Sequence, residues 1–360
     1  MSDNVECIGC ELTYRANAPC FTRNPSTLTS ETPRPVTVNG KKQLVIDMHA
    51  HCQFPEIMPL IKDRPELGGK DPFGQGGWGK GQEVERRLNA MNAMGVDIQV
   101  LSISVFHHHH WAEYNLAQDL CQIQNEKITE ICVMHPDRFV PLSIVALQHP
   151  ELAATQLEYN VKEMGHRGAM ITAALDGEEL SDERFHPFWA KAEELDAPIF
   201  IHPRHFREGA PRFKGKGFLS NIIGNPLDTT VALAHLIYEG TLDKFPGLKI
   251  VAAHGGGFLA SNIGRFNHGH NSGDRGGRGA EKKAPSDYLN QLYFDTVVFG
   301  TENLHHLIRE CGAGQLVLGT DYPAGMSNIN PIAHLLSVEG LSDEDIEAIL
   351  SGTVKKLLKI

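Results

Sequence analysis

The chain has 360 residues, with 33 lysines and arginines against 44 aspartates and glutamates, which gives a formal net charge of -11. This acidic balance argues against nucleic acid or an anionic membrane as the main partner, although a local basic pocket could still hold a small acidic substrate. The hydrophobic content of 41% is that of an ordinary globular protein, and no apolar run approaches the ~20 residues that cross a bilayer.

Residues 1–42 are rich in Thr, Pro, Asn and Ser and show no apolar period, so we expect an N-terminal extension that is irregular or packs over the rest. The extension has no basic start followed by an apolar core, as a secretory signal would. The seven cysteines are odd in number and scattered, which favours reduced thiols and a cytoplasmic protein. Cys7 and Cys10 form a lone C-x-x-C, a weak metal signal that we interpret as free thiols.

Residues 43–360 alternate short β-branched or apolar runs with helical patterns. Such alternation predicts parallel strands joined by right-handed crossovers, and eight units favour a (β/α)8 TIM-type barrel with loop insertions over an open doubly wound sheet. Helical patterns cover 81–95, 114–136 and 183–196, and Gly/Pro-rich insertions at the expected rim cover 66–81, 206–217 and 270–285. The predicted strands are 44–49, 97–103, 139–145, 167–172, 197–202, 248–254, 291–295 and 315–321.

Metal-competent side chains stand at the ends of four of these strands. They are His49 and His51 at strand one, His202 at strand five, His254 at strand six and Asp321 at strand eight. The carboxyl ends of barrel strands meet at one face, so these residues are expected to converge. Taken singly, each histidine reads as a core residue and Asp321 as a turn residue; together they favour a zinc, iron or manganese site.

Spacing adds detail to this prediction. Residues i and i+2 of a strand point to the same face, so His49 and His51 can both turn inward. His254 is interpreted as a general base, with a fifth ligand or a core histidine as alternatives, because imidazole exchanges protons near neutral pH. Strand four ends in RGAMITAALDG without the lysine that would bridge two metals, so one divalent metal is expected.

The segments VIDMHAHC (45–52), FIHP (200–203), AAHGGG (252–257) and LGTDYP (318–323) resemble the motifs of the amidohydrolase superfamily. More narrowly, they are similar to its aminocarboxymuconate-semialdehyde decarboxylase group, which includes resorcylate-type decarboxylases. The resemblance runs from about residue 44 to residue 358. It implies metal ligation by His49, His51, His202 and Asp321, with His254 handling the proton of a metal-bound water.

The resemblance also implies that Arg265 reaches the substrate of a neighbouring subunit, so we expect a homodimer or higher homo-oligomer with shared sites. The second substrate arginine of the group has no clear counterpart, and the tryptophan after His-Pro is replaced by Arg204. Arg204, Arg207 and Lys80 are therefore candidates to hold a carboxylate, although each could equally be a surface charge. His107–His110 is interpreted as an exposed loop, with a substrate contact as the alternative.

These observations favour a metal-dependent, non-oxidative decarboxylase of an unsaturated or aromatic carboxylic acid. Zinc is the expected metal, with manganese close behind. In one route a metal-bound water and His254 handle the proton; in another the substrate binds the metal and Asp321 protonates the ring carbon. The alternatives are a hydrolase of a C–N or C–O bond that uses the same water, and a non-enzymatic binding barrel.

Overall fold

The computed structural model describes residues 29–73, 84–175, 177–215, 217–272 and 279–360. The chain forms two compact units. The first comprises Met1–Ser104, Ile123–Leu142 and Asp295–Ile360, and the second comprises Val105–Gln122 and Ser143–Phe294. Helix α3 (Tyr114–Met134) and strand β12 (Leu292–Asp295) each pass from one unit into the other.

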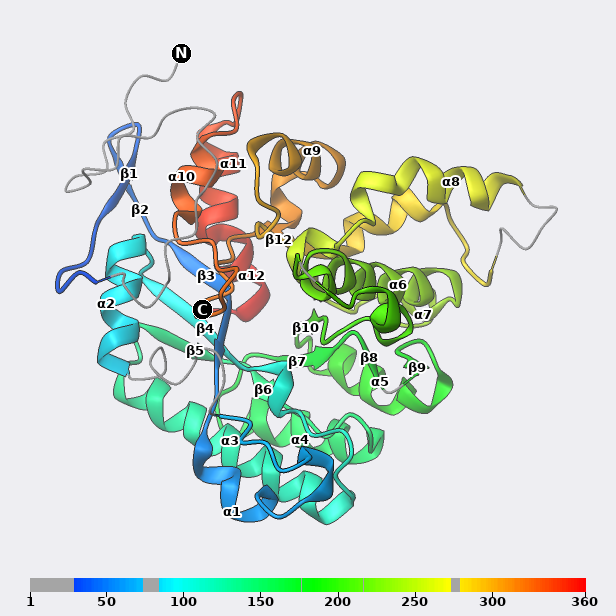
Figure 1. Cartoon of the computed structure of the whole chain (residues 1–360). Helices are drawn as coiled ribbons and strands as arrows, with labels where there is room; N and C mark the ends of the chain where they lie inside the picture. The colour runs from blue at the N-terminus through cyan, green and yellow to red at the C-terminus, as the bar shows by residue number, and fades with distance from the viewer. Residues whose placement is uncertain (1–28, 74–83, 176, 216, 273–278) are drawn as a thin grey trace. The chain divides into compact units, whose positions relative to one another are not determined.

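In the first unit, three parallel strands form a sheet in the order β3-β4-β5. The last strand lies against the first, because the backbone N–H of Met48 donates to Leu318 O at 2.8 Å and Ala50 pairs with Tyr322 in a parallel bridge. In Figure 1, α12 lies beside β3, and the turn Ala348–Gly352 that precedes α12 contacts that strand. The elements of this unit are β1 (Val36–Val38), β2 (Lys41–Gln43), β3 (Ile46–Cys52), β4 (Ile98–Ile103), β5 (Phe139–Pro141), β13 (Leu316–Val317), α1 (Met58–Ile61), α2 (Val84–Met94), α9 (Thr301–Cys311), α10 (Pro331–Leu336), α11 (Asp343–Glu347) and α12 (Thr353–Leu358).

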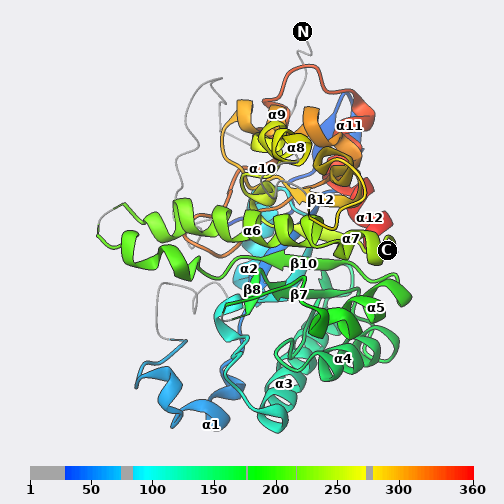
Figure 2. The same ribbon diagram turned by 90° about the vertical axis from the view of Figure 1, so that its right-hand side faces the viewer.

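In the second unit, the parallel strands follow the order β6-β7-β10-β11-β12, and β7 and β10 run side by side in Figure 2. Helices α4 and α5 pack against each other. The small hairpin β8–β9 follows β7 directly. The elements of this unit are β6 (Ser143–Ile144), β7 (Ala169–Thr172), β8 (Ala174–Leu175), β9 (Glu178–Glu179), β10 (Ile199–His202), β11 (Ile250–Ala252), α4 (Pro150–Lys162), α5 (His186–Glu194), α6 (Asn225–Tyr238), α7 (Thr241–Lys244) and α8 (Ile263–Ser272).

Every predicted strand run overlaps a strand of the structure, and the third is divided into β5 and β6 at Leu142. Within each unit, parallel strands that are consecutive along the chain pair with each other, and the last strand bonds to the first. An open doubly wound sheet would instead reverse its strand order at a switch point. The predicted (β/α)8 barrel is therefore confirmed over the open sheet.

The predicted helical patterns at 81–95, 114–136 and 183–196 form α2, α3 and α5. The part of the N-terminal extension that the structure describes is more ordered than expected. Asn39 and Gly40, with φ of 47° and 78°, turn the chain between β1 and β2, as an Asn-Gly pair does in a tight hairpin. Where the extension ends, at residue 42, remains a prediction. Among the described helices, none is long and apolar enough to cross a membrane.

Candidate metal centre

His49 and His51 lie on β3, where every residue is buried. Alternate residues of a strand share a face, so both imidazoles turn to the same side. Their Nε2 atoms lie 3.0 Å apart, and the rings meet edge to face with centroids 4.9 Å apart. The sequence therefore places two metal-competent nitrogens side by side.

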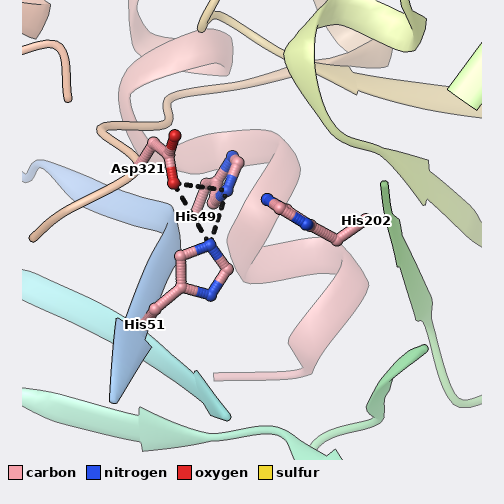
Figure 3. Close-up of side chains that lie close together, drawn as sticks. All are labelled: His49, His51, His202 and Asp321. Atoms are coloured by element: carbon pink, nitrogen blue, oxygen red, sulfur yellow. Dashed lines mark hydrogen bonds and ion pairs between the residues drawn. The ribbon is translucent and has the colours of Figure 1, made fainter. Parts of the chain in front are cut away.

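Asp321 joins these histidines from the end of the last strand, with its side chain turned toward them in Figure 3. Its backbone N–H donates to His49 O at 2.8 Å, and its Oδ1 lies 3.3 Å and 3.2 Å from the Nε2 atoms of His49 and His51. Its φ of 60° is a left-handed conformation that Asp tolerates better than most residues. Gly319 permits the close approach, because a Cβ there would lie 3.0 Å from the Cβ of His49.

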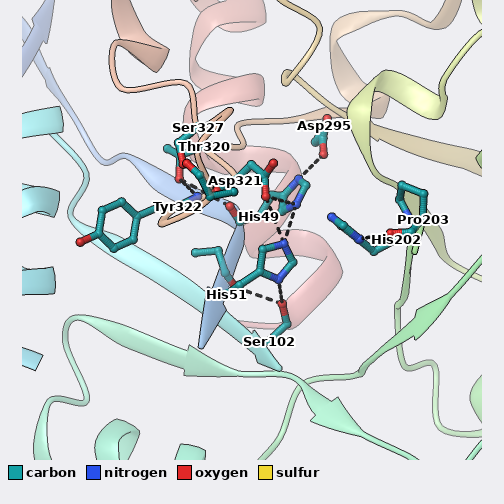
Figure 4. Close-up of polar contacts among 12 residues, drawn as sticks. His49, His51, Ser102, His202, Pro203, Asp295, Thr320, Asp321, Tyr322 and Ser327 are labelled. Atoms are coloured by element: carbon teal, nitrogen blue, oxygen red, sulfur yellow. Dashed lines mark hydrogen bonds and ion pairs between the residues drawn. The ribbon is translucent and has the colours of Figure 1, made fainter. Parts of the chain in front are cut away.

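Each of these two rings has a hydrogen-bond partner on the nitrogen that faces away from Asp321 (Figure 4). Asp295 Oδ2 accepts from His49 Nδ1 at 2.6 Å. The Ser102 hydroxyl donates to Ala50 O at 3.0 Å and therefore accepts from His51 Nδ1 at 3.2 Å. Both histidines therefore direct Nε2 at Asp321 while an outer partner holds Nδ1, as in metal-binding histidines.

The Nε2 atoms of His49 and His51 and Oδ1 of Asp321 thus lie 3.0 to 3.3 Å from one another. Metal bonds of about 2.1 Å at right-angled to tetrahedral geometry would separate the ligand atoms by roughly 3.0 to 3.4 Å. Burial lowers the pKa of His49, but the carboxylates of Asp321 and Asp295 outweigh it and raise this pKa to about 10. The surroundings therefore stabilise positive charge, which a divalent ion would supply.

His202 ends β10, where it pairs with Thr172 of β7. Its Nδ1 donates to Pro203 O at 2.7 Å, which leaves Nε2 as its ligand atom. Among the described residues, the group that could share one ion is His49, His51, His202 and Asp321, whose ligand atoms all lie within 4.8 Å of one another (Figure 3). The structure thus brings together the four residues that the sequence singled out as ligands.

His254 lies just beyond β11 and outside this group of four. It is half-buried with a φ of 54°, and its ring centroid lies 5.1 Å from that of His202. The following glycines are required by close packing, because a Cβ on Gly257 would lie 2.0 Å from Pro226 O. His254 is therefore held beside a ligand, at the place expected of an acid or base.

The predicted substrate residues differ in their placement. Arg204 is half-buried just after β10, where its backbone N–H donates to Asp228 Oδ2 at 3.1 Å. Arg265 and Arg207 are exposed, on α8 and on the segment after β10 respectively. Lys80 lies outside the described residues, as do Cys7 and Cys10 of the extension.

The prediction of an exposed loop at His107–His110 is wrong. All four side chains are buried, with exposed fractions of 1%, 4%, 2% and 8%. Alternate rings pair edge to face, with centroids 5.9 Å apart for His107–His109 and 5.8 Å apart for His108–His110. A polar run placed after a strand reads as exposed, and only the tertiary fold buries it.

Reasoning from the sequence missed the residues that orient the ligands. Asp295 ends the predicted seventh strand, so a carboxylate at a strand end was an available signal. Asp47 had none: its Oδ1 accepts from the backbone N–H of Thr320 at 2.9 Å, and its Oδ2 accepts from the Thr320 hydroxyl at 2.6 Å. This carboxylate ties the last strand to β3 and so fixes Asp321 against His49.

Comparison with known proteins agrees with this fold and site. Residues 46–360 match the sequence model of the amidohydrolase family. A 2-amino-3-carboxymuconate-6-semialdehyde decarboxylase of Dictyostelium discoideum is 29% identical over 343 residues, which cover 88% of this chain and 92% of that protein. A gamma-resorcylate decarboxylase of Rhodococcus jostii is 29% identical over 272 residues, which cover 72% and 82% of the two chains. A dihydroxybenzoic acid decarboxylase from Polaromonas sp., solved with manganese and the inhibitor 2-nitroresorcinol, is 25% identical with a TM-score of 0.74, covering 88% of this chain and 97% of that one.

Proposed function

The chain belongs to the amidohydrolase family, and we propose that it is a metal-dependent, non-oxidative decarboxylase of an aromatic or otherwise unsaturated carboxylic acid. The decarboxylases to which it is similar support this proposal. The observation that carries it is the convergence of His49 Nε2, His51 Nε2 and Asp321 Oδ1 within 3.0 to 3.3 Å of one another.

We assign His49, His51, His202 and Asp321 as ligands of one divalent ion. Imidazole and carboxylate ligands bind both zinc and manganese, so the type of ligand does not choose between them. The manganese bound in the Polaromonas structure supports manganese as one of the two candidates. A single ion fits the end of β7, where Thr172 stands in place of a bridging lysine. When bound, the ion supplies a Lewis acid that stabilises the negative charge developing as CO2 departs.

A residue of the chain must also donate a proton to the carbon that loses CO2. Decarboxylation breaks the bond between a carbon and its carboxylate and leaves the electron pair on that carbon, which takes up a proton. His254 is the proposed donor, because its half-buried ring lies beside His202 and imidazole exchanges protons near neutral pH. Asp321 is the alternative donor, since its carboxylate lies at the same centre.

Recognition of the substrate is assigned to Arg204 and Arg265, since a guanidinium binds a carboxylate with two parallel hydrogen bonds. Arg265 is exposed on α8, which fits a role in the site of a second subunit, so a homodimer or higher homo-oligomer is proposed. A cytoplasmic location is also proposed, because the described cysteines are all free and buried and the acidic charge suits no membrane surface.

The test is to load the purified protein with manganese or zinc and supply 2,6-dihydroxybenzoate, 5-carboxyvanillate and muconate-type acids, alongside amides and lactones. Release of CO2 from an acid, with no hydrolysis, is the expected result. Asp321→Asn should abolish it, whereas Asp137→Asn, at an exposed position outside the metal-binding group, should behave as the wild type. Hydrolysis of an amide or lactone without CO2 from any acid would replace the proposal with a hydrolase.

A further inference from the structure

Strand β3 is irregular where it carries His49. Between Asp47 and Ala50 it holds one more residue than its partner β4 holds between Gln99 and Leu101. Such a bulge disrupts the regular ladder of backbone hydrogen bonds and changes the direction of the neighbouring side chains. The direction of this proposed ligand therefore depends on the groups that hold the bulge.

A chain of hydrogen bonds between buried side chains holds the bulge. Asp47 Oδ1 accepts from the backbone N–H of His49 at 3.1 Å, and Asp47 Oδ2 accepts from Gln99 Nε2 at 2.9 Å. Gln99 Oε1 in turn accepts from Arg87 Nη1 at 3.0 Å. The exposed fractions of Asp47, Gln99 and Arg87 are 0%, 0% and 2%, so all these bonds are made inside the protein. Gln99 thus uses both ends of its amide to connect the guanidinium to the carboxylate.

Arg87, which lies on α2, also contacts the ligand-bearing backbone directly. Its Nη2 donates to His51 O at 2.5 Å. Its guanidinium carbon lies 5.0 Å from the centre of the Tyr322 ring, which points away from the ligand histidines in Figure 4. Tyr322 follows Asp321 in the chain, and its carbonyl accepts from the backbone N–H of His51 at 2.7 Å. One guanidinium therefore contacts both of the segments that carry His51 and Asp321.

The burial of this charge indicates what the guanidinium does. A buried charge lowers stability unless hydrogen bonds compensate for its lost hydration, and apolar side chains of similar volume often serve a core equally well. Arg87 differs from such side chains in its donors, which are rigid and coplanar and here reach two acceptors beside one aromatic face. Its contribution therefore lies in the geometry that it imposes on β3 and on the segment after β13.

We propose that Arg87 is a positioning residue of the metal centre. Its bond to Gln99 holds the bulge at His49, and its bond to the carbonyl oxygen of His51 holds the next ligand of β3. This inference rests on the proposed function, because it concerns the ion that the decarboxylase would hold. Without Arg87 the ligand atoms would keep their chemistry, but their spacing of 3.0 to 3.3 Å would no longer be fixed.

The test measures manganese binding to the full chain, by competition with a chromophoric chelator and by electron paramagnetic resonance of the bound ion. Arg87→Met should bind one ion about 10-fold more weakly than the wild type, the lower end of the range for residues that orient ligands. The resonance spectrum should also change, because it depends on the geometry of the ligands. A residue with a structural role alone would lower the free energy of unfolding and leave both readouts of the folded protein unchanged. Gln99→Met keeps the bond to His51 O, so it should weaken binding by a smaller factor, and it provides the test if Arg87→Met does not fold.

Arg138→Met is the matched control, because Arg138 also bonds one backbone carbonyl and one amide oxygen. Its Nε donates to Asp97 O at 2.7 Å and its Nη2 donates to Asn92 Oδ1 of α2 at 3.0 Å. Asp97 precedes β4, at the end of that strand opposite to the metal centre. Arg138→Met should keep the manganese affinity within about threefold of the wild type, with an unchanged spectrum.

Unchanged affinity and spectrum in a folded Arg87→Met or Gln99→Met protein, or equal changes in Arg138→Met, would overturn the positioning role. This failure is distinct from a failure of the proposed function. A wild type that releases CO2 from an acid while Arg87→Met binds manganese normally would remove the positioning role alone. Weaker binding by Arg87→Met, together with a loaded wild type that releases no CO2 from any acid, would remove the proposed function alone.

Discussion

Replacing Asp295 by Asn tests whether the buried carboxylate behind His49 tunes the metal centre. Asp295 Oδ2 lies 2.6 Å from His49 Nδ1, and neither side chain is exposed to water. Its Oδ1 accepts from the backbone N–H of Val297 at 3.0 Å. The carboxylate thus serves two donors at once, whereas an Asn side chain has a single acceptor oxygen to share between them.

Changes of this kind behind a ligand lower metal affinity by about 10- to 100-fold, equivalent to about 1.4 to 2.7 kcal/mol. The N–H group that the Asn side chain leaves without an acceptor also lowers the free energy of unfolding by about 1 to 3 kcal/mol. We expect Asp295→Asn to bind one manganese or zinc ion with affinity reduced in that range, measured by competition with a chromophoric chelator. Asp137→Asn, at an exposed position, is the control. A folded Asp295→Asn protein with affinity within twofold of the wild type would refute the role of this carboxylate.

Three further predictions concern catalysis, packing and pH. His254→Asn should retain one metal ion and lose about 10²- to 10⁴-fold in turnover, whereas loss of the ion on metal analysis would make His254 a ligand. Gly257→Ala should lower the free energy of unfolding by more than about 2 kcal/mol in denaturant titrations, because its Cβ would meet Pro226 O at a φ of 66°, while the open position of Gly264 makes Gly264→Ala a mild control. The pKa of His107 is about 3 in the folded state and near 6.5 in the unfolded state, so the unfolded state binds the extra proton and the free energy of unfolding falls as the pH drops below 6.5. Between pH 7 and pH 5 this loss amounts to about 2 kcal/mol, and His107→Gln should remove it. A His107→Gln protein with the pH profile of the wild type would contradict this.

The strands and the ligand positions were predictable because both follow from local pattern. Strand β3 alternates Ile46, Met48, Ala50 and Cys52 with Asp47, His49 and His51, so the period of two that marks a strand also set the two histidines on one face. Asp321 and His202 stand at the ends of similar runs, and the barrel brings strand ends to one face whatever the loops contain. Metal ligands that stand at strand ends can therefore be predicted from the sequence.

What the sequence did not reveal depends on contacts between distant residues. The polar run His107–His110 is buried: its alternate rings pair edge to face, and the Thr172 hydroxyl lies 3.4 Å from His110 Nε2. The orienting roles of Asp295 and Asp47 likewise need partners far along the chain, His49 and Thr320. A single carboxylate gives no local sign of which donor it will serve.

The central claim is that one divalent ion is held by three imidazoles and one carboxylate. A crystal structure of the metal-loaded protein, with anomalous data collected at the manganese and zinc edges, measures this directly. We predict a single peak about 2.0 to 2.3 Å from Nε2 of His49, His51 and His202 and from an oxygen of Asp321. A fully loaded protein whose anomalous peak lies elsewhere, or is coordinated by other residues, would contradict the account.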